Sequence, residues 1–498
     1  MCLLKTNCAG KKVLIILILI LIVGSILRFY GLANQSLWND ELSSWVRSSH
    51  GNLSAVMEKG VYTDVHPPGY QLLLYFVEKY IGDSEAILRL PSALSGSLAI
   101  LVIFLTGTRL YSHKEGLIAA VLMAVLWCPI YYSQEARSYS MLLLFTSMAT
   151  YFWISLLQAI NTKTKPSYYS IIGYIISSII ASYLHYFGPY LIALQAIATA
   201  MLAIRKHKAF GYVILLYLPI LLAYMPWMPT MYKHLNQGPI WIGPPGHITK
   251  SFTGYLRFLF NQSMMIYIFA LLMYCFLFLQ SLNNILKFKK YKALETVLLS
   301  PGMLLILWLV VPFVGVYIKS VISAPVLTFR NLIISLPAAY LLLARSITQL
   351  PFGLKNKSIL TCILATLFLA HLMFHMDYYS KPHKQQFREA VAFVAEKNHI
   401  FKDSLIIGYC HYGPAYLDYY FEKKGSDRRV NILAGQKSDI PLVVKALRSE
   451  NPRYVWYIRA HKIPDAQFMN FLVNNLKCIR QKKFLGAYVW LFEYNQTR

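Results

Sequence analysis

The chain has 498 residues, of which 57% are hydrophobic and only 14% are charged, so it has too little polar surface for a water-soluble globule. Its net charge of +27 could indicate a nucleic-acid partner, but the basic residues occur in short loops that alternate with acidic or neutral ones. This alternation is typical of the positive-inside rule of membrane proteins. We therefore expect the lipid bilayer as a partner and no nucleic acid.

Apolar runs of about 17–22 residues recur along most of the chain, and each has the length of a membrane-spanning helix. The first run, Val13 to Phe29, follows Lys11 and Lys12 and has no convincing cleavage site, so we expect a retained anchor with a cytoplasmic N-terminus. About eleven spans are predicted, which places the C-terminus outside. They cover 13–29, 89–109, 116–132, 141–160, 168 to the turn at 185, that turn to 205, 213–227, 264–282, 297–317, 329–345 and a last span that ends near 376.

The first outer loop, residues 31–87, is acidic, whereas the other short loops are basic. Its carboxylates are Asp40, Glu41, Glu58, Asp64, Glu78, Asp83 and Glu85. Two features look chemical: the adjacent pair Asp40 and Glu41, and the run Asp64-Val65-His66-Pro67-Pro68. The segment GYQLLLYFVEKYIG that follows is too short and too charged to span, and it is predicted to be an amphipathic helix at the outer interface.

From about Tyr378 the composition becomes that of a soluble domain. Gln386–Asn398 has helical spacing, and three short apolar runs are predicted to be strands: Ser404–Tyr409, Tyr454–Ile458 and Tyr488–Phe492. We predict two domains, a membrane domain over 1–377 and a small extracytoplasmic α/β domain over 378–498. Cys410 and Cys478 could form a disulfide there, but their spacing alone does not decide it.

Several polar residues of the predicted outer face lie at or near helix ends, where backbone dipoles help to shape a charged site. They are Asp40, Glu41, Asp64, His66, Arg137, Tyr139, His185, Tyr186 and Arg330, with Trp241 in a long outer loop. A carboxylate there can act as a general base, and Arg or His can hold a phosphate. The alternatives are lipid-headgroup anchoring for Arg137 and Arg330, and an aromatic belt for Tyr139, Tyr186 and Trp241.

The order of six motifs carries a family resemblance over residues 13–345. The motifs are LWNDE, DVHPPGY, ILRLPSALSG, YYSQEARSYS, SYLHYFGPY and FRNLIISLPAA. In this order they resemble the GT-C membrane glycosyltransferases, and more narrowly the bacterial branch related to protein O-mannosyltransferases and to the lipid A aminoarabinose transferase. The resemblance implies a polytopic helical fold with two juxtamembrane helices in the first outer loop. It also implies transfer of a sugar from a polyprenyl-phosphate carrier to an acceptor.

The resemblance assigns roles to individual residues. Asp40 matches the catalytic base and Glu41 its acidic neighbour, while His66, Arg137 and Tyr139 match positions near the donor phosphate. Arg330 matches the Arg of a later Arg-Tyr pair, but Asn331 stands where the family has Tyr, which weakens that assignment. The loop around Trp241 corresponds to a mobile outer loop, and Asp64, His185 and Tyr186 are expected to line the site.

A polyprenyl phosphate is already a good leaving group, so the chemistry needs no nucleotide site, and the sequence has no P-loop or Gly-rich fingerprint. We expect an inverting transfer to a lipid, polysaccharide or protein acceptor on the outer face of the plasma (inner) membrane. A divalent metal on Asp40, Asp64 and His66 is conceivable, although their spacing does not require one. The alternative is a transporter or flippase of lipid-linked sugars, which would place ionisable residues near the midplane of its helices.

Overall fold

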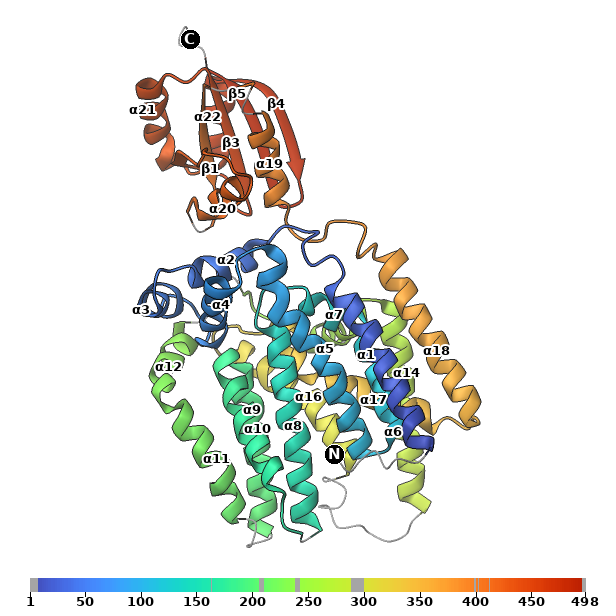
Figure 1. Cartoon of the computed structure of the whole chain (residues 1–498). Coiled ribbons are helices and arrows are strands. Elements are labelled where there is room, and N and C mark those ends of the chain that lie inside the picture. Colours follow the sequence, from blue (N-terminus) through green and yellow to red (C-terminus); the bar gives the residue numbers. More distant parts are fainter. Residues whose placement is uncertain are drawn as a thin grey trace. The chain divides into compact units, whose positions relative to one another are not determined.

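The computed structural model describes residues 8–162, 164–205, 210–237, 242–287, 300–397, 400–401, 403–411 and 413–494 (Figure 1). The chain forms two compact units. The membrane unit comprises Met1–Tyr30, Met57–Leu73 and Arg89–Met376, and the C-terminal unit comprises Gly31–Val56, Leu74–Leu88 and Asp377–Arg498. The sequence had placed the whole loop 31–87 in the first domain. Two segments of that loop belong instead to the compact unit that contains the tail.

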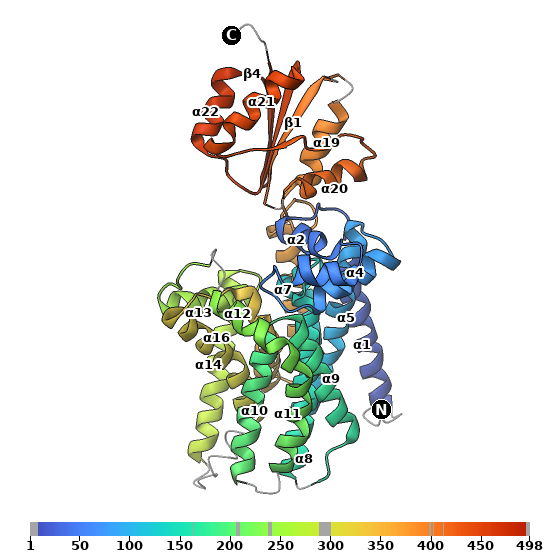
Figure 2. The same ribbon diagram turned by 90° about the vertical axis from the view of Figure 1, so that its left-hand side faces the viewer.

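The membrane unit is a bundle of apolar helices, and α8, α9, α10 and α11 pack against one another in it (Figures 1 and 2). Its helices are α1 (Cys8–Phe29), α5 (Glu85–Leu110), α6 (His113–Val125), α7 (Trp127–Ser133), α8 (Tyr139–Asn161), α9 (Tyr168–Leu184), α10 (Phe187–Arg205), α11 (Phe210–Tyr224), α12 (Met228–Gln237), α13 (Ile248–Leu259), α14 (Met264–Lys287), α16 (Pro301–Ile322), α17 (Leu336–Gln349) and α18 (Leu354–Ala370). Short turns of other helix types are η1 (Val56–Val61), η3 (Met225–Trp227), η4 (Phe329–Ser335) and η5 (His371–His375). The first turn of α5, residues 85–88, lies in the C-terminal unit.

Within the described residues, nine helices are long and apolar enough to cross a membrane. The bent pair α6–α7 would make a tenth span, and α9 is apolar but only 17 residues long. The chain is therefore a multi-pass membrane protein. Its orientation and the predicted count of about eleven spans stay predictions.

The predicted span 116–132 is broken, because α6 ends at Val125 and α7 starts at Trp127 with a bend of 58°. Pro129 explains the break. A proline has no N–H to donate, and its ring would clash with the carbonyl four residues earlier, which is that of Val125. In the first turn of α7 the same proline is tolerated.

Side chains from elsewhere in the bundle satisfy the backbone groups that the break exposes. The buried Arg28 guanidinium donates to the carbonyls of Met123 (2.7 Å) and Ala124 (3.2 Å), and Asn261 Oδ1 accepts the Trp127 N–H (2.6 Å). Such partners are needed because unsatisfied backbone groups are costly in an apolar bundle. Through α7, Arg28 helps to place the turn that carries the predicted site residues Arg137 and Tyr139.

We therefore expect Arg28→Leu to lower the melting temperature of the purified protein in detergent. The variant leaves two buried carbonyls without this donor, at about 1–3 kcal/mol each. Arg257→Leu is the control, because Arg257 is exposed. Equal melting temperatures for the two variants would contradict this account of the break.

The C-terminal unit contains a five-stranded sheet in the order β2-β1-β3-β5-β4 (Figure 1). The strands are β1 (Ser404–Tyr409), β2 (Ile432–Leu433), β3 (Tyr454–Ala460), β4 (Lys477–Phe484) and β5 (Ala487–Glu493). β2, β1 and β3 are parallel, and β5 is antiparallel to both β3 and β4. The other elements are α19 (Phe387–Lys397), α20 (Ala415–Lys423), η6 (Lys437–Asp439), α21 (Ile440–Glu450) and α22 (Ala466–Asn475), together with the loop helices α2 (Asn39–Ser48), α3 (Leu53–Ala55) and the end of α4 (Gly69–Tyr80).

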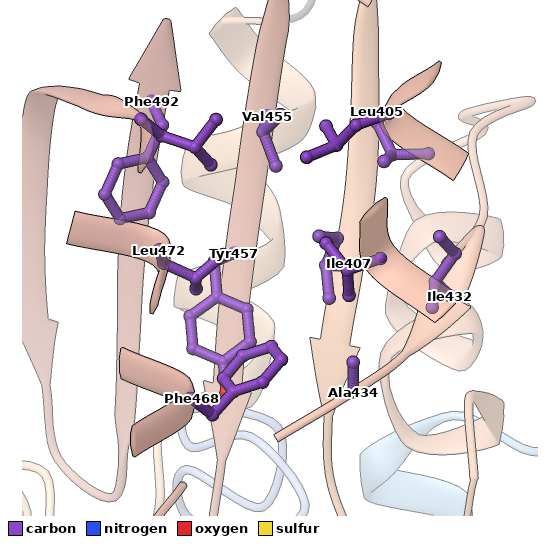
Figure 3. Close-up of a cluster of buried hydrophobic side chains, with 12 residues drawn as sticks. Leu405, Ile407, Ile432, Ala434, Val455, Tyr457, Phe468, Leu472 and Phe492 are labelled. Carbon is purple, nitrogen blue, oxygen red and sulfur yellow. The ribbon is translucent and has the colours of Figure 1, made fainter. Parts of the chain in front are cut away.

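Alternating apolar residues of the central strands form the core of this sheet. Leu405, Ile407, Val455 and Tyr457 lie in one buried cluster with residues such as Phe468 of α22 (Figure 3). The predicted strand 404–409 is confirmed, and the other two predicted strands fall within β3 and β5. β4 was missed because this edge strand is almost wholly exposed and has no apolar alternation.

Candidate functional site

In the membrane unit, a buried carboxylate orients His66. Asp64 accepts the Val65 N–H (2.7 Å) and a Gln71 side-chain N–H (2.8 Å), and its Oδ1 lies 3.1 Å from His66 Nδ1. A carboxylate on one ring nitrogen fixes the tautomer and orientation of a histidine, and it leaves the other nitrogen for a ligand. The contacts of Asp64 are thus those of a residue that positions His66.

Arg137 extends from the turn between α7 and α8 toward His66. Its Nη2 lies 3.4 Å from His66 Nε2, and the guanidinium is almost fully buried. The backbone of this turn is fixed to α5, because Ser92 Oγ donates to the Arg137 carbonyl (3.0 Å). A buried guanidinium beside an imidazole forms a site that suits an anionic oxygen group.

Arg330 adds a second cation, which lies beside Tyr139. The Arg330 guanidinium lies 5.5 Å from the centre of the Tyr139 ring, within the range of a cation–π contact. Arg330 is the second residue of η4, and Asn331 next to it also lines the cavity described below. Arg330 therefore lies at the cavity beside Tyr139, although Asn331 stands where the family has Tyr.

His185 lies between these groups. Its ring centre is 5.5 Å from that of His66 and 5.7 Å from that of Tyr139. Burial lowers the pKa of His185 well below its usual value, and the nearby His66, Arg137 and Arg330 lower it further. A neutral His185 adds no positive charge to that of the two guanidinium groups.

Tyr186 belongs to a neighbouring aromatic group. Its hydroxyl lies 2.7 Å from His234 Nδ1 and accepts the Trp227 indole N–H at 3.3 Å. Burial raises the pKa of Tyr186 to about 12, so the phenol is neutral at physiological pH. The Trp227 ring also stacks on Tyr62, at 5.9 Å between ring centres.

Several of these residues, but not Arg137 or Asp64, border a cavity of about 790 Å³ in the membrane unit. Its polar end is lined by His66, Tyr139, His185, Tyr186 and Arg330. Beyond them the lining is mostly apolar and comes from α10, α11, α12 and α16, with residues such as Ile192, Ala196, Ile214, Leu218 and Val316. The cavity combines a cationic end with a long apolar wall.

The other two predicted site residues, Asp40 and Glu41, lie in the first turn of α2 in the C-terminal unit. Asp40 is half-buried. Glu41 is fully buried, and its Oε1 lies 3.0 Å from Nζ of the equally buried Lys384. Glu41 also accepts the Trp38 N–H (3.3 Å), as a helix-capping carboxylate does.

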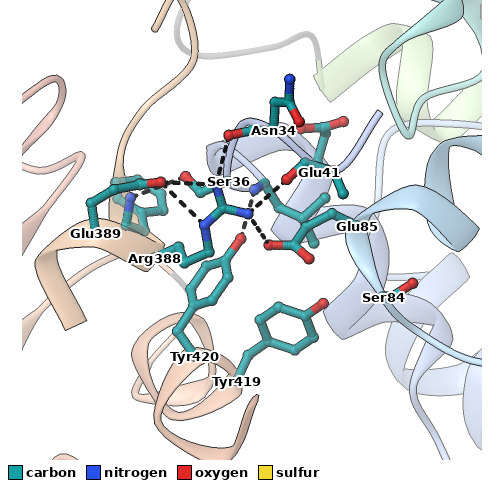
Figure 4. A network of polar contacts seen from close by, with 12 residues as sticks. Asn34, Ser36, Glu41, Ser84, Glu85, Arg388, Glu389, Tyr419 and Tyr420 are labelled. Atoms are coloured by element: carbon teal, nitrogen blue, oxygen red, sulfur yellow. Dashed lines mark hydrogen bonds and ion pairs between the residues drawn. The ribbon is translucent and has the colours of Figure 1, made fainter. Parts of the chain in front are cut away.

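A network around Arg388 binds α19 to the loop segments of the same unit (Figure 4). The guanidinium donates to the carbonyls of Ala33 (2.8 Å) and Asn34 (2.7 Å) and pairs with Glu85 and Glu389 at 3.0 Å each. Together with the Glu41–Lys384 pair, these bonds hold Asp40 on a framework made by the tail.

Some predictions fall outside these contacts. Trp241 lies outside the described residues. In the part of the chain that the structure describes, no group of three or more His, Cys, Asp or Glu side chains has metal-binding geometry, so the metal on Asp40, Asp64 and His66 stays a prediction. Cys410 and Cys478 are free thiols there, the first buried and the second exposed.

Sequence reasoning missed several residues that support or line the site. Gln71, which holds Asp64, is a polar residue inside the apolar run GYQLLLY, and this anomaly could have revealed it. His234 and Lys319 line the cavity, but they come from a helix and a span whose sequences carry no motif.

The fold and the cavity define a multi-pass membrane protein with a cationic pocket among its helices and a small C-terminal sheet domain. Residues 65–230 match the family model described as dolichyl-phosphate-mannose-protein mannosyltransferase. No curated protein matches the chain by sequence.

Solved structures share this fold over nearly the whole chain. Similar structures include ArnT from Cupriavidus metallidurans in the apo state (TM-score 0.60, 10% identity) and bound to undecaprenyl phosphate (TM-score 0.55, 12% identity), each covering 97% of this chain and 98% of the other. The oligosaccharyltransferase AglB from Archaeoglobus fulgidus matches with a TM-score of 0.52 and 10% identity, covering 98% of this chain and 75% of AglB. At these identities the likeness concerns the fold. With the family match, it confirms the resemblance predicted from the motif order.

Proposed function

We propose that the protein is a membrane glycosyltransferase that moves a sugar from a polyprenyl-phosphate-linked donor to an acceptor on the extracytoplasmic face. The acceptor is a lipid such as lipid A, a polysaccharide or a protein. One observation carries the proposal: the cavity of about 790 Å³ has cationic residues at one end and apolar helices along the rest. A lipid phosphate has the same two parts, a phosphate head and a long hydrocarbon tail.

The donor phosphate is assigned to His66, Arg137 and Arg330. Arg137 is suited to a bidentate contact with phosphate oxygens, and the Asp64-oriented His66 places its Nε2 3.4 Å from the Arg137 guanidinium. Arg137 is buried, and His66 and Arg330 are half-buried. Groups that are already held in place can stabilise the charge that develops on the departing phosphate without reorganising. The undecaprenyl phosphate bound to the ArnT of similar fold supports this choice of ligand.

Asp40 is assigned as the general base. The acceptor oxygen attacks the anomeric carbon from the side opposite the phosphate, and Asp40 takes the proton of the acceptor. The bond between the anomeric carbon and the phosphate oxygen breaks, and polyprenyl phosphate leaves with the electron pair, which inverts the anomeric centre. Glu41, paired with Lys384, holds α2 in place and is assigned a positioning role.

The proposal requires a defined orientation in the membrane. A reporter fused after Met376 should be active on the extracytoplasmic side, and one inserted at Lys290 on the cytoplasmic side, because the basic loops are expected inside. Activity on the opposite side at either point would contradict an extracytoplasmic site.

The function itself can be tested in a strain from which the gene is deleted. Mass spectrometry of its lipid A, other glycolipids, surface polysaccharide and proteins should show one class that lacks a sugar, and the wild-type gene should restore it. A gene with Asp40→Asn is the matched control and should fail to restore the sugar. Unchanged profiles in all four classes would contradict the proposal.

A further inference from the structure

One glutamine of the tail, Gln385, is hydrogen-bonded to the first turn of α2, the helix that carries Asp40. The Gln385 side chain accepts the Asn39 backbone N–H at Oε1 (3.0 Å), and its Nε2 lies 2.8 Å from His461 Nδ1. Its backbone carbonyl accepts the Ser36 hydroxyl. The amide oxygen of Gln385 thus binds α2, and its amide nitrogen contacts His461, the residue after β3.

The connection continues to the carboxylate. Asn39 is itself largely buried, and its side-chain amide donates to Asp40 Oδ1 at 3.1 Å. The Asn39 carbonyl accepts the Tyr416 hydroxyl from α20 (2.9 Å), so this residue is held from two directions by the tail. A chain of three hydrogen bonds therefore runs from His461 through Gln385 and Asn39 to Asp40.

The backbone around Gln385 is shaped to hold it. Gly486 has a φ of +70°, and a Cβ there would lie 2.5 Å from Gln385 Cγ, so only glycine fits against this side chain. The His461 N–H donates to the Gly486 carbonyl (2.9 Å), and His461 has a φ of +67°, which is uncommon for a residue other than glycine. Unusual backbone of this kind persists where surrounding contacts enforce it.

The charges near Asp40 agree with this arrangement. Partial burial lowers the pKa of His461, while Asp40 acts in the opposite direction and raises it, and Lys462 and Arg459 lower it. Burial also lowers the pKa of His411, with contributions in the same direction from Lys462, His461 and Arg47, against Asp40. Asp40 thus raises the pKa of both His461 and His411.

We propose that Gln385 is a positioning residue: through Asn39 it sets the orientation of the Asp40 carboxylate, and His461 locks the amide of Gln385 in the required direction. The proposal rests on the proposed function, in which Asp40 is the base. It gives the C-terminal domain a part in acceptor activation, because its tail residues would complete the environment of a residue encoded near the start of the chain.

The test compares Gln385→Met with Gln386→Met in the full-length protein. The two glutamines are a matched pair: both are half-buried, and the Gln386 Oε1 also accepts a backbone N–H at 3.0 Å, that of Leu485. We expect Gln385→Met to lower kcat about tenfold with the donor KM unchanged, as a misplaced catalytic group does. Gln386→Met should keep the wild-type kcat.

Two further variants separate positioning from general stability. Gln385→Glu keeps an oxygen for the Asn39 N–H and should recover most of the lost kcat. If Gln385 acts through Asn39, the double variant Gln385→Met/Asn39→Leu should be no slower than Asn39→Leu alone. Equal kcat for Gln385→Met and Gln386→Met, or fully additive losses in the double variant, would overturn the proposal.

A readout that does not depend on turnover keeps this proposal separate from the proposed function. Carbodiimide modification of Asp40, followed by mass spectrometry, should be faster in Gln385→Met than in wild type or Gln386→Met, because the carboxylate is no longer held. Unchanged labelling would overturn the positioning role. Faster labelling in a protein that transfers no sugar would instead reject the glycosyltransferase function.

Discussion

Asp40→Asn should leave the protein folded and inserted in the membrane but lower sugar transfer by roughly 10²–10⁴-fold, the usual contribution of a positioned general base. The amide keeps the size of the side chain, and its oxygen can still accept the Asn39 amide hydrogen that Oδ1 accepts now. The basicity is lost together with the negative charge. The measurement is sugar transfer from a purified donor by matched amounts of wild-type and variant enzyme.

Glu41→Gln is the informative comparison for this variant. Glu41 and Lys384 form a buried ion pair, so Glu41→Gln leaves the buried Lys384 ammonium without its carboxylate. Breaking such a pair typically costs about 3–5 kcal/mol of stability. We expect less folded protein but a milder loss of activity per folded molecule. If Asp40→Asn keeps more than about a tenth of the wild-type activity, which is outside the range for a base, Asp40 does not have this role.

Arg137→Ala should raise the donor KM about 10–100-fold, because charge-assisted hydrogen bonds contribute about 1.5–3 kcal/mol. Arg137→Lys should be less severe, since lysine keeps the charge and loses the fork that binds two phosphate oxygens. Burial of Arg137 beside His66 argues against simple headgroup anchoring, which needs exposure to lipid.

Steady-state kinetics with varied donor concentration checks this prediction. Arg257→Ala is the control, because Arg257 is an exposed arginine of the same unit. Donor kinetics unchanged from wild type in Arg137→Ala would assign Arg137 to the structure of the α7–α8 turn and would remove it from the phosphate site.

The helical bundle could be predicted from the sequence because a bilayer demands long apolar runs. The break at Pro129 was missed, although a proline within a predicted span is a visible signal for it. The edge strand β4 could not be predicted, since Lys477–Phe484 is exposed and has no apolar period. Hydropathy also cannot assign Gly31–Val56 to the C-terminal unit, because that membership depends on contacts distant in sequence.

Part of the candidate site could likewise be predicted from the sequence, and part is visible only in the fold. The motif order placed His66, Arg137 and Tyr139 near one phosphate, and Asp64 was expected to line the same site. The structure brings these residues close together in the membrane unit. Gln385 carried no comparable signal. It lies 346 positions from Asn39 along the chain, and only the fold shows that the two are hydrogen-bonded.

The most direct test of the central claim is a reconstituted transfer assay. Purified protein in liposomes receives a polyprenyl-phosphate-linked sugar labelled in the sugar, together with a membrane extract as the source of acceptor, and both the labelled acceptor and the free polyprenyl phosphate are measured. We predict that wild-type protein produces labelled acceptor and free polyprenyl phosphate in equal amounts. Asp40→Asn should produce almost none of either. Movement of intact donor across the bilayer, with no release of polyprenyl phosphate, would contradict the account and identify a flippase.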